Sequence, residues 1–343
     1  MASLQYKCLN CKAGLEFYPP TQKWKCHYCF SEFTKEELDE VQQVQDSMDE
    51  ELPELDSYRC TSCGAELITD KTTSATFCLY CKNPAIIKSR FTGKFKPKYV
   101  IPFRLTKEQA VELYKKWIGK HLFAPDEFKH KEEMEKVTGV YAPFWLFDCK
   151  TQGSIEGQGT RVRSWTQGEY RYTETRYYRV VRSGSAEYNK VPVDASKKLD
   201  DAFMQLIEPY NYQDLTDFSM QYMSGFMAEK YDVESEEAKS AVKKRVEQYT
   251  EKRLKETIGG YASYRDTYKS ITLQEAQENY ALLPVYLLVN KYKGKDHLFI
   301  VNGQTGKVVG DAPISRWKQL RFAGLIFAAS WLLAVFGGAL FGR

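Results

Sequence analysis

The hydrophobic and polar positions of this chain follow two periods, and the changes between them predict its elements. From Gly139 to Asp194 apolar and polar residues alternate between glycine-containing turns, which predicts three to five antiparallel strands. After Gly260 the alternation returns for four more strands, with a turn at 302–307. The middle of the chain is therefore predicted to be rich in antiparallel β structure.

Helix start and stop signals separate these strands. A Thr-x-x-Gln capping pattern precedes a helix predicted over 107–120, and another helix is predicted over 126–137. Helices resume at Lys197, and a long one over 234–258 ends before a Gly-Gly pair, as the end of a helix commonly does.

A strongly acidic stretch, 32–56, contains eleven acidic residues and one lysine. Thr34 and Glu37 form a capping box, Pro53 ends the pattern, and apolar residues share an approximate helical stripe. The stripe consists of Leu38, Val41, Val44, Met48 and Leu52. This predicts a short amphipathic helix that either packs on one of the two small cysteine-containing modules (zinc ribbons) beside it or docks a basic partner.

The tail from Phe322 to Phe341 is twenty residues without a charge. As a helix it would be about 30 Å long, the thickness of a bilayer core, so a transmembrane helix is predicted, with a buried soluble helix as the alternative. Arg316, Lys318 and Arg321 precede it and only Arg343 follows, which predicts a cytoplasmic location for the preceding chain.

Small residues recur every four positions within this tail. They are Ser330, Ala334, Gly338 and Gly342. Such a stripe lets a second helix approach closely, either from another copy of the chain or from another membrane protein. The ordinary enrichment of glycine and alanine in membrane helices is the alternative explanation.

Eight of the nine cysteines form two frames of identical spacing, C-x2-C-x14-C-x2-C. Two intervening residues let both sulfurs face one ion, and fourteen allow a hairpin to return the second pair. Two zinc ions are predicted, with rubredoxin-type iron as the alternative. Four protein ligands leave no open coordination position, so the sites are expected to be structural. The ligands are Cys8, Cys11, Cys26 and Cys29, and Cys60, Cys63, Cys78 and Cys81.

Positions beside these ligands are also informative. The turn after a Cys-x-x-Cys pair favours positive φ, which Gly64 supplies, whereas Lys12 at the matching place predicts slight strain. The ninth cysteine, Cys149, lies in a predicted strand and is expected to be a packing residue, with a reactive thiol as the alternative.

A basic segment follows the second frame, and no acidic residue occurs from Lys71 to Lys107. Aromatic residues interleave with its cations, as in segments that bind lipid headgroups or single-stranded nucleic acid, and a solvated linker is the alternative. The candidate contacts are Lys88, Arg90, Lys94, Lys96 and Lys98. Six arginines on the predicted strands form either a solvated face or a phosphate-binding face: Arg161, Arg163, Arg171, Arg176, Arg179 and Arg182.

Charge and motifs limit the function. The formal net charge of +4 falls to near zero once eight thiolates bind two divalent ions, so the net charge gives no argument for nucleic acid, which is not the expected partner. The start of the chain lacks a signal-peptide pattern, so reduced thiols are expected. The four histidines are scattered and no phosphate loop or metalloprotease motif occurs, so the protein is not expected to be an enzyme.

These patterns predict an α+β protein with two four-cysteine zinc ribbons, a β-rich antiparallel α+β domain and one C-terminal transmembrane helix. The expected boundaries are 1–33 for ribbon 1, 34–56 for the acidic helical linker, 57–99 for ribbon 2 with its basic extension, 100–315 for the β-rich domain and 320–342 for the transmembrane helix.

Three further motifs carry a resemblance to a known family: "YAPFW" from Tyr141, "LLPVY" from Leu282 and "NGQTGKVVGDAPIS" from Asn302. With the cysteine pairs and the apolar tail, they make the chain similar to bacterial, Firmicutes-type membrane-anchored double zinc-ribbon proteins, often labelled transcription-factor-IIB-type zinc-ribbon proteins. The chain departs from the family pattern at Tyr286, where a tryptophan is usual, and in having two full ribbons.

The resemblance implies a membrane anchor that works with band-7-type (SPFH) scaffold proteins and phage-shock-type proteins in envelope stress. The expected function is a cytoplasm-facing scaffold or adaptor that binds protein partners at the bacterial inner membrane, as a single-pass protein that can self-associate through its membrane helix. The alternative is a membrane-tethered protein that binds nucleic acid through 88–104.

Overall fold

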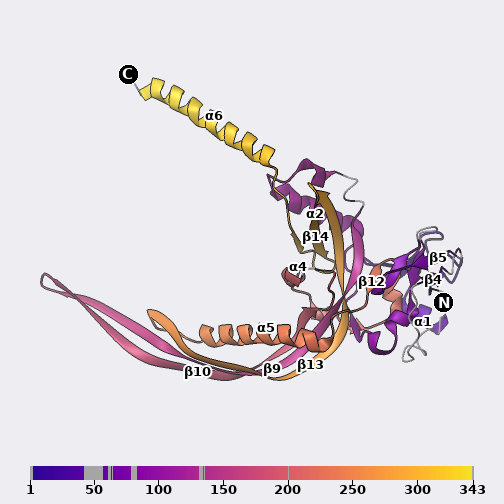
Figure 1. Cartoon of the computed structure of the whole chain (residues 1–343), viewed down its shortest axis with the longest axis horizontal. Helices are drawn as coiled ribbons and strands as arrows, with labels where there is room; N and C mark the ends of the chain where they lie inside the picture. The colour runs from indigo at the N-terminus through magenta and orange to yellow at the C-terminus, as the bar shows by residue number, and fades with distance from the viewer. Residues whose placement is uncertain are drawn as a thin grey trace.

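The computed structural model describes residues 3–41, 57–60, 63, 65–78, 83–130, 134, 136–199 and 201–341. Only the backbone is described at 41, 57, 66–68, 201, 332 and 334–341. The chain is an α+β protein built on one large sheet, as its alternating pattern predicted (Figure 1).

Two very long strands organise the large sheet. β9 (Thr138–Gln167) and β13 (Ser263–Tyr292) are each 30 residues long and run antiparallel to each other. Short strands extend the sheet on either side, in the order β11-β8-β13-β9-β12-β6-β7, while β14 pairs with β13 and β15 with β14. The added strands are β6 (Thr73–Phe77), β7 (Pro84–Ile86), β8 (Tyr99–Val100), β11 (Thr216–Asp217), β12 (Met227–Glu229), β14 (Lys295–Asn302) and β15 (Val308–Gly310).

β9 continues beyond this body into an arm. It pairs with β10 (Tyr170–Asp194) in a hairpin that turns at Gly168, where φ is +63°. The first half of β13 adds a third strand to the arm. α5 (Ser235–Glu256) lies along one face of the arm, on the inner side of its curve (Figure 1).

The prediction of three to five strands over 139–194 is therefore wrong, because its internal glycines do not make turns. A Cβ at Gly153 would lie 3.0 Å from the Thr250 side chain of α5. A Cβ at Gly157 or Gly159 would meet the ring of Tyr264 or Tyr261 at 2.5 or 2.6 Å. These glycines let a helix and two rings approach an unbroken strand. Likewise, three strands follow Gly260 instead of the predicted four.

The helix predictions have mixed outcomes. α2 (Lys107–Lys120) has the predicted limits, with both capping-box hydrogen bonds between Thr106 and Gln109. α5 ends near the predicted Gly-Gly pair, and α4 (Asp201–Leu206) follows the predicted restart near 197. The turn at 302–307 is also present, with Gly306 at φ +77°.

The helix predicted over 126–137 is wrong in its first part. A 3-10 turn, η4 (Asp126–Lys129), ends at His130 in an extended conformation. The Tyr114 hydroxyl donates to the Phe128 carbonyl at 3.1 Å, so α2 satisfies a group that a longer helix would have used internally. Further 3-10 turns are η2 (Lys88–Phe91), η3 (Gly93–Phe95), η5 (Tyr212–Asp214) and η6 (Met220–Met223).

Alternation along β9 places side chains in two cores, one on each face of the body sheet. Tyr141 and Trp145 pack on the face that carries Phe103 and Phe226, whose rings stack at 4.0 Å, while Phe144 packs on the opposite face. Cys149 is buried at 2% exposure, as expected of a packing residue, and burial raises the pKa of its thiol to about 11.

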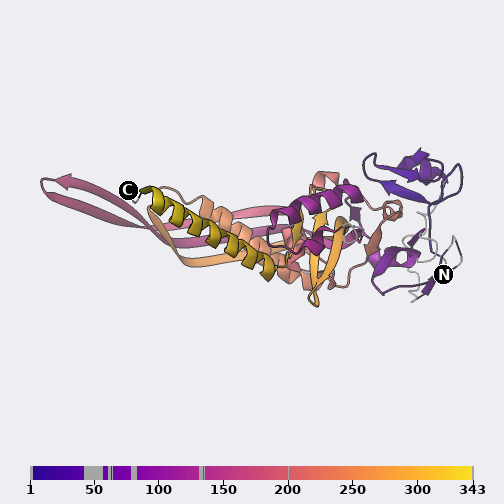
Figure 2. The same ribbon diagram turned by 90° about the horizontal axis from the view of Figure 1, so that it is seen from above.

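The last helix, α6 (Arg316–Phe341), is fixed to the body at its first turn. Lys318 Nζ donates to the Ala124 carbonyl at 2.7 Å and pairs with the Asp126 carboxylate at 2.6 Å. Beyond this base the helix projects away from the body, on the same side as the arm in both views (Figures 1 and 2). Among the described residues, no helix combines the length and apolarity that a membrane span requires.

Candidate metal centres

Ribbon 1 is a three-stranded sheet whose two cysteine pairs lie at the same end. β1 (Leu15–Tyr18), β2 (Lys23–Cys26) and β3 (Glu32–Phe33) pair in order and in antiparallel fashion. One cysteine pair precedes β1, and the other occupies the turn between β2 and β3. The hairpin expected from the fourteen-residue spacing therefore brings the two pairs together.

The four sulfurs of ribbon 1 have the spacing of a metal site. All lie within 4.8 Å of one another, and the Cys8–Cys29 and Cys11–Cys26 distances between Sγ atoms are both 3.5 Å. Sulfurs about 2.3 Å from one ion at the corners of a tetrahedron lie about 3.8 Å apart. The distances are too long for disulfides, whose sulfurs are about 2.05 Å apart. The site thus fits one tetrahedral ion.

Ribbon 2 repeats the arrangement on two hairpins. Its first cysteine pair lies between β4 (Ser57–Arg59) and β5 (Glu66–Ile68), and its second follows β6. Cys60, Cys63 and Cys78 form a group that can hold an ion, with 3.7 Å between the sulfurs of Cys63 and Cys78. Cys81, the fourth predicted ligand, lies outside the described residues.

The backbone around the cysteine pairs follows one pattern four times. The N–H of each first cysteine donates to the carbonyl five residues later, at 2.7 to 2.9 Å; these residues are Cys8, Cys26, Cys60 and Cys78. In ribbon 1 the residue after each pair has positive φ, 65° at Lys12 and 60° at Phe30. The strain predicted at Lys12 is therefore present, and Phe30 shares it.

The thiols of ribbon 1 differ in acidity. The hydroxyl of Ser31, 3.3 Å from Cys29 Sγ, and the Ser31 backbone N–H hold the pKa of Cys29 down at about 6. The Ala13 N–H acts in the same direction at Cys11, but burial and the neighbouring thiols raise the pKa of Cys11 to about 12. Four adjacent thiolates repel one another, and a divalent cation would remove that repulsion.

Ribbon 1 is attached to the body mainly by side chains. Trp24 is 1% exposed, contacts Phe17 and Tyr222, and donates from Nε1 to the Gln221 carbonyl at 2.8 Å. Backbone hydrogen bonds accompany these contacts: the Phe17 N–H donates to the Ser224 carbonyl at 2.9 Å, and Leu4, which precedes β1, exchanges two bonds with Ile86 of β7, at 2.7 and 3.0 Å. The apolar face of ribbon 1 thus belongs to the main core.

Ribbon 2 is attached by backbone pairing. Its second hairpin, β6 and β7, joins the edge of the large sheet, where Ala75 of β6 pairs with Ala228 of β12. Cys60 and Cys78 pack in a small separate cluster with Tyr58, Ala85 and Ile87. The predicted boundary at 99 therefore falls within one continuous sheet.

The acidic linker begins as predicted. α1 (Lys35–Val41) follows a capping box in which the Thr34 N–H donates to Glu37 Oε2 and the Glu37 N–H donates to Thr34 Oγ1. Leu38 is fully buried in the core with ribbon 1, which agrees with packing on a ribbon at this position. The remainder, 42–56, lies outside the described residues.

The candidate cations of the basic segment have different environments. Arg90 is 1% exposed and donates to the Asp70 and Thr73 carbonyls and to Thr69 Oγ1. Its predicted contact with lipid headgroups or nucleic acid is wrong, since a guanidinium buried on backbone carbonyls cannot reach a ligand. Lys88 is half-buried, and Lys98 bonds to Asn279 at 2.7 Å. Only Lys94, Lys96 and Lys98 are exposed.

The small residues predicted for helix packing are described only in part. Ser330 is exposed on α6. Only the backbone is described at Ala334 and Gly338, and Gly342 lies outside the described residues, so the stripe stays a prediction.

Two exposed aromatic side chains were not predicted from the sequence. Tyr28 is 80% and Phe30 is 72% exposed, within and beside the second cysteine pair of ribbon 1. The one signal for them was the match between Tyr28 and Tyr80 in the duplicated frames, which gave no indication of exposure.

Comparison with known proteins gives one informative relative. The chain is 36% identical over 335 residues to the uncharacterized protein YdjG of Bacillus subtilis (strain 168), a match that covers 98% of this chain and 95% of that protein. No protein-family model matches the chain, and no solved structure matches it. The relative supports the bacterial, Firmicutes-type resemblance, and the cysteine groups agree with two metal-binding ribbons.

Proposed function

The chain belongs to the family of the Bacillus subtilis protein YdjG, and we propose that it is a membrane-anchored scaffold that binds protein partners at the cytoplasmic face of the bacterial inner membrane. The observation that carries this proposal is the environment of α6. Beyond its first turn, the described side chains of the helix contact little of the body, and the apolar ones among them are exposed.

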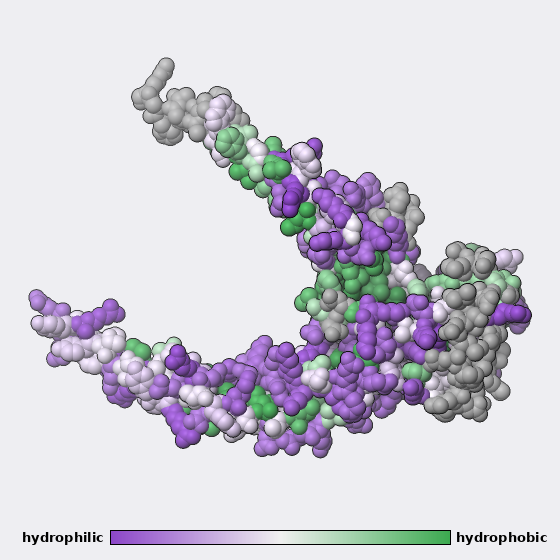
Figure 3. All heavy atoms as spheres, viewed as in Figure 1, coloured by the Kyte–Doolittle hydropathy of each residue, from purple (hydrophilic) through white to green (hydrophobic). Residues whose placement is uncertain are grey.

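The exposure of α6 is not confined to one face. Leu325, Ile326, Phe327 and Leu333 are between 53% and 76% exposed, and at 3.6 residues per turn they are spread around the helix. Figure 3 shows apolar residues exposed along the described part of α6. Four such side chains in water each forgo about 1.5–3 kcal/mol of burial free energy. The interior of a bilayer would supply that burial.

The cations at the base of α6 suggest an orientation. Lys318 is held by Asp126, and Arg316 and Arg321 lie within the first two turns. Since basic residues favour the cytoplasmic side of a membrane helix, the body would lie in the cytoplasm. This compartment would also keep the cysteines reduced for metal binding.

Zinc is the ion we propose for both cysteine groups, in a structural role. Four thiolates at tetrahedral spacing suit zinc, and they would occupy every coordination position. The ion would hold the cysteine turns of each ribbon together and perform no chemistry.

Tyr28 and Phe30 provide a surface for a protein partner. They lie on the second cysteine turn of ribbon 1, and ribbon 1 lies at the end of the molecule opposite to the tip of the arm (Figures 1 and 2). Rigid exposed aromatic side chains are typical anchors of protein interfaces. Following the family resemblance, we propose band-7-type or phage-shock-type proteins as partners, and a second copy of the chain as the neighbour of the small-residue stripe.

Deletion of Phe322 to Arg343 tests the anchor. The full chain should float with vesicles in a density gradient, and the shortened chain should stay in the soluble fraction with both metals bound. Ile326→Arg in the full chain is the point variant that should weaken flotation. Membrane association of the shortened chain, or salt-dependent binding of single-stranded nucleic acid by the full chain without flotation, would contradict the proposal.

A further inference from the structure

One face of the arm carries an excess of arginine beyond the end of α5. Register places Arg182, Arg161, Arg176 and Arg163 on the face that α5 covers nearer the body, because opposite residues of an antiparallel pair share a face. Glu174 is the one acidic residue that β9 and β10 contribute to this stretch of the face; β13 adds Asp266, which pairs with Lys255 of α5 at 2.6 Å. This stretch, with Arg161, Arg163, Arg176 and Arg182, is the arginine face.

Most of these arginines are positioned by neutral groups. Arg161 donates to the Gly260 carbonyl at 3.1 Å and lies over the rings of Tyr178 and Tyr261 at 5.1 and 5.2 Å. Arg182 donates to the Thr257 carbonyl at the end of α5. Carbonyls and rings orient a guanidinium without cancelling its charge, so the arginine face keeps most of its positive charge.

The arginine face also contains a like-charge pair. Arg161 and Arg176 are directly opposite each other across the two strands, an arrangement that costs stability unless an anion lies between or above them. Glu174 compensates Arg176 in part, at 2.8 Å. On the opposite face, both oxygens of Glu156 accept hydrogen bonds from Arg179, at 2.6 and 2.8 Å. The charge of Arg179 is therefore neutralised more fully than that of Arg161.

Aromatic side chains continue the arginine face toward the tip. Trp165 stacks on Tyr172 at 5.7 Å, Arg163 lies over the Trp165 ring at 5.8 Å, and both rings are more than 40% exposed. Tryptophan and tyrosine concentrate at the headgroup level of membranes, and arginine pairs with the phosphates found there. The composition of this face therefore suits an anionic lipid surface.

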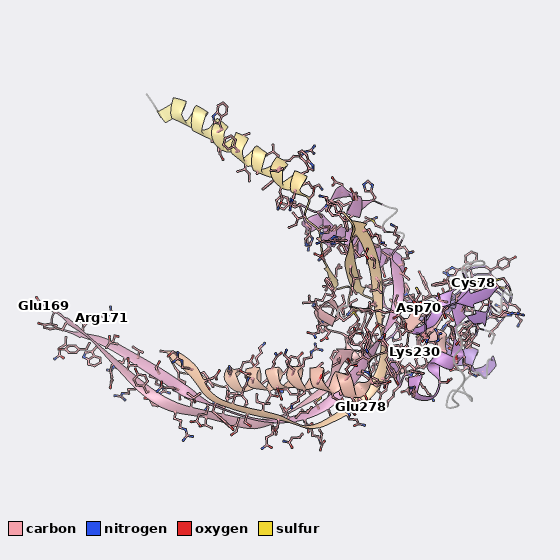
Figure 4. All side chains as sticks on the ribbon, in the orientation of Figure 1. Asp70, Cys78, Glu169, Arg171, Lys230 and Glu278 are labelled. Carbon is pink, nitrogen blue, oxygen red and sulfur yellow. The ribbon has the colours of Figure 1, made fainter. Side chains whose placement is uncertain are left out.

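The placement of the arm suits the same surface. The arm and α6 leave the body on the same side in both views, and the tip near Glu169 and Arg171 lies far out on that side (Figures 1, 2 and 4). Beyond the body, β9 runs from about Lys150 to Gln167, which is about 60 Å along its contour, against about 39 Å for the 26 residues of α6. If α6 enters a bilayer, the bilayer surface lies at its base, within reach of the arm.

We propose that the arginine face binds the anionic phospholipid headgroups of the membrane that holds α6, so that the chain contacts the bilayer at two separated places. This inference rests on the proposed membrane anchorage. It adds a lipid-binding site to that anchorage and assigns the recognition to Arg161, Arg163, Arg176 and Arg182 together with Trp165 and Tyr172.

Quenching of Trp165 by brominated lipid tests the contact. The full chain and its Trp165→Phe variant are reconstituted in vesicles of brominated phosphatidylcholine, with and without phosphatidylglycerol. The wild-type chain should show additional quenching, absent from the variant, only when phosphatidylglycerol is present. In the wild-type background, Arg163→Gln with Arg176→Gln should reduce that difference about fivefold or more, since each arginine near an anionic surface contributes about fivefold.

A matched control removes the same charge from the opposite face, by Arg171→Gln with Arg265→Gln, and should keep the quenching. Equal quenching of Trp165 in neutral vesicles, or equal loss in both double variants, would overturn the inference while flotation still supports the anchor. Lack of flotation would instead reject the proposed function. Binding of a labelled single-stranded oligonucleotide that only the Arg163/Arg176 variant loses, without lipid quenching, would assign the face to nucleic acid.

Discussion

The two ribbons have identical cysteine spacing and are attached to the protein in different ways. Ribbon 1 keeps its three strands out of the large sheet and contacts the body mainly through buried side chains, chiefly Trp24, with an isolated backbone bridge from Leu4 to Ile86 of β7. Ribbon 2 donates half of its strands to the large sheet through the β6–β12 pairing. A duplicated module can therefore be a removable attachment in one copy and a part of the scaffold in the other.

The largest expected effect is a difference between the loss of the ribbon 1 metal and the loss of the ribbon 2 metal. Cys60→Ser and Cys8→Ser should each lower bound metal by about one equivalent, because binding free energy is folding free energy in such modules. Only Cys60→Ser should also increase amide hydrogen exchange in β6 and β12, since β6 carries Cys78 at its end. Metal analysis and exchange mass spectrometry measure both quantities.

The two substituted cysteines serve as controls for each other, since they are 2% and 0% exposed. Equal hydrogen exchange in β12 in the two variants would contradict the proposed difference in how the two ribbons are attached. Retention of both metals by either variant would contradict the ligand assignment.

A smaller effect should follow from Trp24→Ala, which removes the main contact of ribbon 1. A loss of about 3–5 kcal/mol in the free energy of unfolding is expected for a buried tryptophan, with both metals retained. Trp24→Phe should cost less, because it loses mainly the 2.8 Å bond to the Gln221 carbonyl. Denaturant unfolding measures the loss; release of the ribbon 1 metal would show that its fold depends on the body.

The smallest expected effect concerns the backbone strain found in ribbon 1. Phe30→Gly should stabilise ribbon 1 by about 1 kcal/mol, since glycine adopts positive φ without the penalty of other residues. Phe30→Ala removes the same ring and keeps the strain, so it should give no gain. Thermal unfolding of the two variants separates backbone from ring, and equal stability would mean that φ 60° carries no cost here.

Local patterns predicted the parts of the fold that depend on local chemistry. A metal site requires cysteines at fixed spacing, and the capping box before α2 is complete within four residues, so the sequence indicates both directly. The strain at Lys12 followed from the same turn geometry.

Long-range contacts explain the failures. Taken alone, Gly153 resembles a turn residue. The structure shows instead that it leaves room for the side chain of Thr250 in α5, almost one hundred residues later in the sequence. Arg90 resembles one more surface cation of a basic run, yet its guanidinium fills a space among the carbonyls of another segment. The pairing of β6 with β12 leaves no periodic signature in either strand. Sequence period reports which face is apolar, and it does not report which distant segment will cover that face.

The unequal partners of β9 also determine the order in which the arm can assemble. Its pairing with β10 starts at Gln167 and Tyr170, three residues apart, so the hairpin can close as soon as it leaves the ribosome. The pairing with β13 starts between Thr160 and Ser263, 103 positions apart, and carries a greater loop-closure entropy. Until β13 is synthesised, one edge of a 30-residue strand is open to pairing with other chains, which makes the nascent arm the part of this protein most exposed to aggregation.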